Sequence, residues 1–434
     1  MKKILSRAFL CSLFVAGPLP ARTAGAQSAP FRVEPISALP TAGTIYRNET
    51  AGVLLVRDPQ AAGDSFSNLY VADLQNTGVT PQDLELHGPL LYYHSGTGSF
   101  AVTKMERGLD ARLAGRLYRE GNFNGTPLLQ LDGSPLIEVS AQAPTPVHPV
   151  ENTLPAVESL ASGVAAARIQ KTVEQLAQIH TRYHRSDGGK EVPTLLAALY
   201  QEAARGRPDV RIETFEHESR HTPQKSLIAR IVGQKNPNEI VVVGSHIDSI
   251  NQRDPYARSP GADDDASGTA INLELFRLLM ERGVQLDRTL EIHGYAAEEA
   301  GLVGSQEIAR SYVEAGKAVI SMLQNDMNLY SKDGKMKIWL VSSNTSDLLN
   351  EMLGRLISGY VGVPWEKRRL GLGSSDHSSW NRNGVHAAFP FEDPGASNPR
   401  IHTQNDTVEG ASWEQAAAFA RLSLAFAAHF AGIL

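Results

Sequence analysis

The chain contains a single cysteine, Cys11, and this scarcity of thiols limits the chemistry that it can perform. Cys11 lies in an apolar stretch near the start of the chain, so a mature form without that stretch has no cysteine. Such a form has neither a disulfide bond nor a catalytic thiolate. Any metal site in it must be built from His, Asp and Glu side chains.

The sequence also lacks an apolar run of the roughly 20 residues that a membrane span needs. Its first residues have the pattern of a secretory signal, with a basic start, the apolar core AFLCSLFVAG at 8–17 and the small-residue site AGA at 24–26. We therefore expect a signal peptide over residues 1–26, no transmembrane segment, and a secreted or periplasmic product that begins near Gln27.

Positive charge is in the minority, with 41 Lys and Arg against 47 Asp and Glu and a formal net charge of −6. Residues 1–26 hold four basic residues and no acidic one, so their removal lowers the net charge to −10. No run of Lys or Arg stands out, and nucleic acid is therefore a poor candidate partner. The composition, 42% hydrophobic and 20% charged, is typical of one large or two moderate globular domains.

A proline-rich passage at 141–158 separates two regions of different pattern. Before it, short alternating stretches such as TAGVLLVRD, SNLYVADL and PLIEVSAQ are divided by Gly, Pro and Asn, which predicts β structure. After it, VAAARIQKTVEQLAQIHTRYH and VPTLLAALYQEAARG have the periodicity of helices. We expect a β-rich N-terminal pro- or accessory domain with its linker over 27–160, and a second domain over 161–434.

In the second region, strand-like runs alternate with helical segments as far as the C-terminus. Runs such as SLIARIVG, EIVVVGSHID, TLEIHGYAAEE and VISMLQNDMN are almost continuously apolar, as expected for strands that are buried on both faces. The alternation predicts an α/β fold with a mixed, largely parallel central sheet and helices on both of its faces.

Acidic and imidazole side chains recur where these strands end, which is the edge at which such sheets bind ligands. His246 and Asp248 end one strand, Glu298 and Glu299 end another, and Asp326 ends a third. Any one of them alone is compatible with an ordinary solvated strand end. Together they are the residue types with which a protein without cysteine binds zinc.

The spacing of His246 and Asp248 and that of Glu298 and Glu299 suggest a different chemical role for each member of the pair. In the His-x-Asp pair, Asp248 can accept the free N–H of a metal-bound His246 and so fix its tautomer. Glu298 and Glu299 are adjacent and point to opposite sides of an extended segment. One of them can therefore bind a metal while the other takes a proton from water.

The order of motifs over about residues 165–434 resembles that of bacterial leucyl aminopeptidases of the dinuclear zinc exopeptidase family. The motifs are GSHIDS, PGADDDASG, YAAEEAGLVGSQ, QNDM, SSDHSSW, PFE and NPRIHTQND. The resemblance implies an enzyme with two Zn²⁺ per chain and a water shared by the two metals as nucleophile. It implies peptide substrates with a free N-terminus and a hydrophobic, Leu-like first residue, and we expect a monomer.

The resemblance assigns the metal ligands position by position: His246 and Asp326 to one zinc, Glu299 and His402 to the other, and Asp264 as the bridge between them. A carboxylate suits the bridging place because two ions about 3.5–4 Å apart need a ligand with two donor oxygens. Glu298 corresponds to the general base and Asp248 to the carboxylate that supports His246.

The three adjacent acids in PGADDDASG then have different expected places. The resemblance implies a cis peptide bond after Asp264, and Asp265 is expected at the start of the following helix, where the helix dipole favours an acid. Asp263 is expected to be a solvated group or to lie behind the ligands.

An apolar pocket for the first substrate side chain carries over as Met327, Leu340, Leu372, Phe389, Phe391 and Ile401. Leu372 occupies the position of a family tyrosine that donates to the developing oxyanion, and Leu370 and Ser374 occupy those of a cysteine pair. Stabilisation of the transition state is therefore expected to depend more on zinc. We expect His377 to support the site without binding metal, and His293 to be a core residue.

Three other functions are compatible with the same fold. A glutaminyl cyclase uses one zinc and would not need both His246 and Asp326, and a catalytically silent binding domain would have lost ligands. A carboxypeptidase is the more serious alternative, because its metal site would look similar. It would need a basic group to hold the terminal carboxylate, and Arg400 is the nearest candidate.

Overall fold

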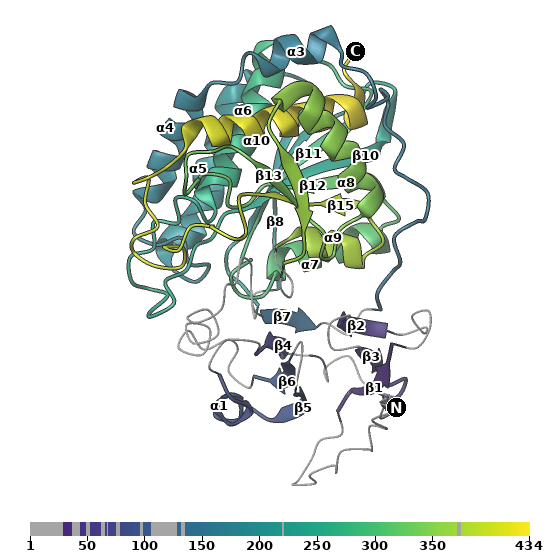
Figure 1. Cartoon of the computed structure of the whole chain (residues 1–434), viewed down its shortest axis with the longest axis vertical. Coiled ribbons are helices and arrows are strands. Elements are labelled where there is room, and N and C mark those ends of the chain that lie inside the picture. Colours follow the sequence, from purple (N-terminus) through teal and green to yellow (C-terminus); the bar gives the residue numbers. More distant parts are fainter. Residues whose placement is uncertain are drawn as a thin grey trace, which may run out of the picture.

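The computed structural model describes residues 29–36, 44–48, 53–61, 66, 68–74, 79–95, 99–105, 128–131, 135–218, 221–370 and 375–434. The expected signal peptide and Leu372 lie outside the described residues. A smaller β-rich unit lies below a larger α/β unit in Figure 1, and an extended segment joins the two. Within the ranges given, no helix combines the length and the apolar character that a membrane span requires.

Two antiparallel sheets, β1-β3-β2 and β5-β6-β4-β7, form the β unit. Its elements are β1 (Phe31–Pro35), β2 (Thr44–Asn48), β3 (Val53–Arg57), β4 (Leu69–Asp73), α1 (Pro81–Glu85), β5 (Leu90–His94), β6 (Phe100–Lys104) and β7 (Leu128–Leu131). Alternate residues of β4 enter different apolar clusters: Leu69 and Val71 pack in one, Tyr70 and Ala72 in the other. Each face of the second sheet is thus covered, as the alternating pattern predicts.

The central sheet of the α/β unit has the strand order β15-β12-β10-β11-β9-β8. Its strands are β8 (Val210–Phe215), β9 (Ser226–Ile231), β10 (Asn236–His246), β11 (Arg288–Tyr295), β12 (Ala318–Gln324) and β15 (Ala387–Ala388). The four strands from β15 to β11 pair in parallel, whereas β9 and β8 add antiparallel. A small separate sheet, β14-β13-β16, consists of β13 (Ile338–Val341), β14 (Trp365–Arg368) and β16 (Pro390–Phe391).

Helices cover both faces of the central sheet. They are α3 (Pro155–Ala161), α4 (Ala166–Ala177), α5 (Asp187–Ala204), α6 (Ala266–Glu281), α7 (Val303–Glu314), α8 (Asp347–Leu356), α9 (His377–Arg382) and α10 (Trp413–Ala427), with the π-helical turns η2 (Ile357–Val361) and η3 (Ala428–Gly432). Val241 and Val243 of β10 face the main core with α4, α5, α6 and α10, whereas Ile240 and Val242 face α7 and α9. The predicted fold class is confirmed.

Two local predictions were wrong. The helix expected through 164–184 ends at Ala177, because the backbone then turns to place a buried Arg182 beneath the strand ends. The strand expected in PLIEVSAQ is an extended segment with a single bridge, between Ile137 and Asn383.

Candidate active site

The polar strand ends meet at one edge of the central sheet because their strands are parallel neighbours. His246 is the last residue of β10 and pairs with Tyr295, the last residue of β11, while Gln324 of β12 pairs with Gly244. The segments that carry Glu298, Glu299 and Asp326 therefore leave the sheet beside His246. Asp264 directly precedes Asp265, the N-cap of α6, and a later loop supplies His402.

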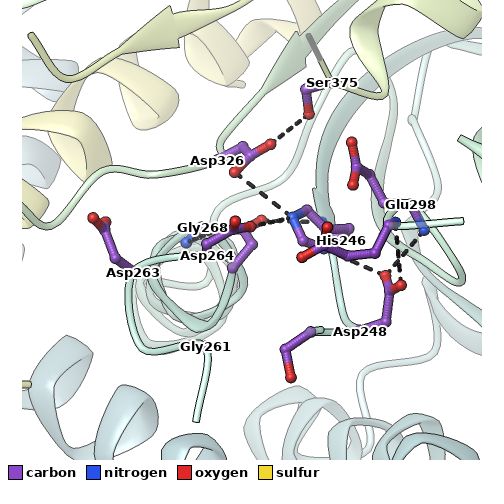
Figure 2. Close-up of polar contacts among 12 residues, drawn as sticks. His246, Asp248, Gly261, Asp263, Asp264, Gly268, Glu298, Asp326 and Ser375 are labelled. Carbon is purple, nitrogen blue, oxygen red and sulfur yellow. Dashed lines mark hydrogen bonds and ion pairs between the residues drawn. The ribbon is translucent and has the colours of Figure 1, made fainter. Parts of the chain in front are cut away.

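Five expected ligands form one buried group, the ligand cluster: His246, Asp264, Glu299, Asp326 and His402. Asp264 lies at its centre, with Oδ1 2.9 Å from His246 Nε2 and Oδ2 2.8 Å from His402 Nε2. Asp326 Oδ1 lies 3.7 Å from His246 Nε2, and Glu299 Oε2 lies 3.3 Å from His402 Nε2. The cluster thus divides into two sets of potential ligands that share only Asp264, and Figure 2 shows the first set.

The ligand cluster contains polar atoms that only a further group could satisfy. Asp326 Oδ1 and Glu299 Oε1 are buried and have no hydrogen-bond partner. Buried carboxylate oxygens without partners are rare in proteins, because removing them from water costs free energy. The mixture of imidazole nitrogen and carboxylate oxygen suits zinc and similar divalent cations, so these residues fit a metal in each set.

The electrostatics of the ligand cluster also indicate a cation site. Burial would lower the pKa of His402, but attraction to Glu299 and Asp264 raises it to about 10. The pKa of Asp264 lies well below its usual value although burial acts in the opposite direction, because His402 and His246 stabilise the charged form. Because a metal ion and a proton bind to the same imidazole nitrogens, they compete for the two histidines.

Asp248 connects His246 to the segment that carries the two glutamates. Its Oδ1 lies 3.3 Å from His246 Nδ1 and accepts the backbone N–H of Glu298 at 3.0 Å, while its Oδ2 accepts that of Glu299 at 3.2 Å. One carboxylate therefore orients an imidazole and fixes both glutamates, which fits the supporting place expected for it.

The side chain of Glu298 is buried beside the ligand cluster and points away from Asp248 (Figure 2). Burial raises its pKa well above the usual value, and the neighbouring charge of Glu299 adds to this despite the attraction of His246. A carboxyl group with a raised pKa next to a metal site can both accept and return a proton.

The acidic triplet separates as expected, and Asp263 takes one of the two places expected for it. Asp265 Oδ1 caps α6 by accepting the N–H of Gly268 at 2.8 Å, and its Oδ2 accepts the N–H of His246 at 3.0 Å. The peptide bond between Asp264 and Asp265 is cis, as the resemblance implies. Asp263 is 1% exposed and accepts the N–H of Leu329 at 2.9 Å, so it lies behind the ligands and is not solvated.

Four of the six expected pocket residues pack together beside the ligand cluster: Met327, Phe389, Phe391 and Ile401, joined by Val341 and Leu370. Met327 follows Asp326 directly and Ile401 precedes His402, so an apolar wall borders the metal ligands. The structure does not bring Leu340 into this group. Successive residues of a strand face opposite sides, and on β13 it is Val341 that enters the group while Leu340 packs in the main core.

Three further residues support the ligands and were not predicted from the sequence. Ser375 Oγ donates to Asp326 Oδ2 at 2.6 Å, and Gln252 Nε2 lies 2.9 Å from His402 Nδ1. Asp406 accepts the N–H groups of Asp263 and Asp264, each at 3.1 Å. Ser375 and Asp406 lie within the motifs SSDHSSW and NPRIHTQND, which could have drawn attention to them, whereas no pattern marks Gln252.

Arg182 also supports the site, and it lies in a stretch that the sequence pattern predicted to be helical. It is fully buried and donates to the carbonyl oxygens of Ile247, Pro260 and Gly261 at 3.0, 2.5 and 2.9 Å. Burial lowers its pKa, while the charges of the surrounding acids, Asp265 first, act to raise it. Arg182 therefore joins the segment after His246 to the segment before the acidic triplet and places a positive charge beneath the acids.

Three other expectations concern basic residues outside the ligand cluster. His377 Nε2 lies 3.1 Å from the carbonyl oxygen of Ser343, and His293 Nε2 lies 2.9 Å from Glu291 Oε2 in the core, so neither histidine belongs to either ligand set. Arg400, the candidate carboxylate binder, donates to Asn398 and to the carbonyl oxygen of Glu409 within its own loop.

Comparison with known proteins agrees with this site. Residues 226–427 match the model of peptidase family M28. Leucine aminopeptidase 1 of Arthroderma otae is 35% identical over 291 residues, which cover 64% of this chain and 77% of that protein. Leucine aminopeptidase 1 of Coccidioides posadasii is 38% identical over 274 residues, which cover 60% and 69%. These relatives are fungal, so the likeness to bacterial enzymes in particular is not supported by them.

Solved structures share the fold. LapB from Legionella pneumophila matches with a TM-score of 0.70 at 25% identity, over 83% of this chain and 98% of that one. The LapA aminopeptidase of the same organism gives 0.69 at 24% identity, over 84% and 98%. The chain belongs to peptidase family M28 and is a metallo-aminopeptidase.

Proposed function

We propose that the protein is a zinc aminopeptidase that binds two Zn²⁺ and releases hydrophobic, Leu-like residues from the N-terminus of peptides. The observation that carries the proposal is the position of Asp264, whose two oxygens face two different histidines, each with its own carboxylate. One metal would be held by His246, Asp326 and Asp264, and the other by Glu299, His402 and Asp264.

The preference for the first residue is supported by the wall beside the ligands. Met327, Phe389 and Phe391 are buried and pack in one apolar cluster with Val341. Such a wall can remove an aliphatic or aromatic side chain from water but leaves a charged one without partners. The leucine aminopeptidases among the relatives are consistent with this preference.

In the reaction, Glu298 takes a proton from the attacking water and passes it to the departing amine. Its buried carboxylate lies beside the ligand cluster, where it can bind the proton and then release it. The carboxylate of Asp248 accepts the backbone N–H of Glu298 and lies beside the imidazole of His246, so it positions both residues. When bound, the two zinc ions would polarise the scissile carbonyl and make the water more acidic.

We also propose that residues 1–26 direct secretion and that the mature enzyme is a monomer. The support is the sequence pattern at 1–26 and a catalytic set assembled entirely from one chain. Size-exclusion chromatography and N-terminal sequencing of the mature protein test these two proposals.

A panel of peptides with free and blocked amino ends tests the proposed reaction. We expect cleavage of leucyl-anilide and of free-amino peptides, loss of activity with a chelator, and recovery with zinc. Binding of about two zinc ions per chain should accompany the recovery. Release of C-terminal residues alone would favour the carboxypeptidase, against which the contacts of Arg400 already argue.

A further inference from the structure

The segment that carries Glu298 and Glu299 also contributes a side chain to the core of the β unit. Leu302 is fully buried and belongs to the hydrophobic cluster of the β unit, which includes Ile45, Leu55, Leu69, Val71, Leu129 and Leu131. Among the described residues it is the one member of this cluster that comes from the α/β unit. The β unit and the catalytic segment thus share a hydrophobic core.

The backbone of this segment, the 296–302 loop, needs such an anchor. Leu302 has φ 62° and follows Gly301 at φ 102°. A leucine in the left-handed region is uncommon and persists only where its surroundings hold it. Burial of the Leu302 side chain in the hydrophobic cluster of the β unit contributes to that support.

Hydrogen bonds also hold the 296–302 loop along its whole length. Ala296 N–H donates to Ser226 Oγ at 2.9 Å, Ala297 N–H donates to Gln224 Oε1 at 3.1 Å, and Asp248 accepts the N–H groups of the two glutamates. At the C-terminal end, Gln306 Nε2 of α7 donates to the carbonyl oxygen of Gly301 at 2.8 Å, and the β unit adds the Leu302 side-chain contact and a bond from Gln130 N–H to the same oxygen at 3.5 Å. The β unit and α7 therefore support this end of the loop together.

We propose that Leu302 is a positioning residue, through which the β unit holds Glu298 and Glu299 in their working geometry. The inference rests on the roles proposed above for these two glutamates. It makes the β unit a retained part of the active enzyme, because its removal would expose Leu302 and leave this end of the loop held by α7 alone.

The solved relatives of this fold support a retained β unit. The match to LapA covers 84% of 434 residues, about 365, which exceeds the 300 residues from 135 to 434. The match therefore includes part of the N-terminal region, and it also covers 98% of the LapA chain. A counterpart of part of the β unit is thus present in a solved aminopeptidase chain.

Three substitutions at Leu302 in the full-length zinc-loaded enzyme separate the side-chain anchor from the backbone shape. Leu302→Ala loses the anchor, Leu302→Gly loses it but favours the left-handed backbone, and Leu302→Met keeps an apolar side chain of similar volume. We expect Ala and Gly to lower kcat about 10- to 100-fold with KM and zinc content little changed, and Met to keep most of the activity. A fully active Leu302→Gly enzyme would show that the anchor is dispensable.

Hydrogen exchange gives a readout that does not depend on turnover. Amides of the 296–302 loop should exchange faster in Leu302→Ala than in the unmodified protein, while those of the central sheet stay protected. Unchanged loop exchange would overturn the proposal. If Glu298→Gln proved fully active, the proposed base would be wrong, yet the exchange data would still decide whether Leu302 holds the loop.

A matched pair within the β unit provides the control and a route if the Leu302 variants fail to fold. Val71 packs in the cluster of Leu302, whereas Leu84, in α1, packs in the other cluster of the same unit. Val71→Ala should lower kcat and speed loop exchange, and Leu84→Ala should do neither. Equal losses in both variants would assign the effect to general weakening of the β unit and contradict the proposal.

Discussion

Asp248 Oδ1 lies 3.3 Å from His246 Nδ1, and the same carboxylate accepts the backbone N–H groups of Glu298 and Glu299, which follow the end of the neighbouring strand β11. A displacement of Asp248 would therefore disturb a metal ligand and the proposed base together. This coupling distinguishes it from an ordinary carboxylate that supports a ligand, which acts on one imidazole alone.

Asp248→Asn should weaken metal binding and slow turnover at once. An amide has only one acceptor oxygen, so it can keep one of the two N–H groups but cannot balance a metal-bound imidazole. We expect a loss of about 10- to 100-fold in metal affinity, with a larger loss in kcat. Metal titration and steady-state kinetics on the same preparation measure both. A variant with full kcat once saturated with zinc would show that only the imidazole depends on Asp248.

Glu298→Gln should keep the metals and lose the reaction. The substitution preserves the shape and the backbone contacts but removes the group that transfers the proton, which contributes about 10²- to 10⁴-fold in rate. Zinc content and leucyl-anilide hydrolysis are the two measurements. Glu299→Gln is the matched control, because it should lose one metal; if Glu298→Gln loses metal instead, the two roles are exchanged.

Asp264→Asn should weaken both metals together, because each oxygen of Asp264 faces a different ligand set. Asp326→Asn should weaken only the metal bound with His246. Stepwise zinc titration of the two variants measures the difference. Retention of one tight zinc in Asp264→Asn would contradict the bridging role.

The ligand cluster could be predicted from the sequence because its chemistry is local. His246, Glu299 and Asp326 each lie at or just after a strand end, and parallel strands bring their ends to one edge. Asp264 and His402 depended on the motif order, because helix starts and loops have no fixed place in such a sheet.

The supporting contacts could not be predicted in the same way. Leu340 and Val341 are both apolar, so the pattern did not decide which of them faces the pocket. Arg182 lies in a stretch of helical periodicity, and Leu302 contacts a unit that is distant in the sequence. Such contacts depend on how the elements pack, which one sequence does not specify residue by residue.

His184 should make the fold sensitive to mild acid. It is buried, with Nδ1 2.9 Å from Thr222 Oγ1, and burial lowers its pKa to about 4. Because the pKa in the unfolded chain is about 6.5, the unfolded state binds more protons between these values. The stabilisation from neutral His184 is therefore complete above pH 6.5 and is lost as the pH falls toward 4, by up to roughly 3 kcal/mol.

Urea unfolding at pH 7.5 and 4.5 measures this loss. His184→Gln retains a group that can bond to Thr222 but does not titrate, so its stability should fall less between the two pH values. An identical pH dependence in both proteins would exclude His184 as the source.

Arg182→Met should destabilise the whole α/β unit as well as the site. The methionine fills part of the space but leaves the carbonyl oxygens of Ile247, Pro260 and Gly261 without the guanidinium donor. It also leaves the neighbouring acids, Asp265 first, without a positive counter-charge. Removal of one partner from a buried charged network costs about 3–5 kcal/mol.

Arg182→Lys should recover only part of this stability, because one ammonium cannot reach three carbonyls in the geometry of a guanidinium. Added zinc should raise the melting temperature of both variants by neutralising the acids. Equal stability of the methionine variant and the unmodified protein in the metal-free state would show that the buried guanidinium is not needed.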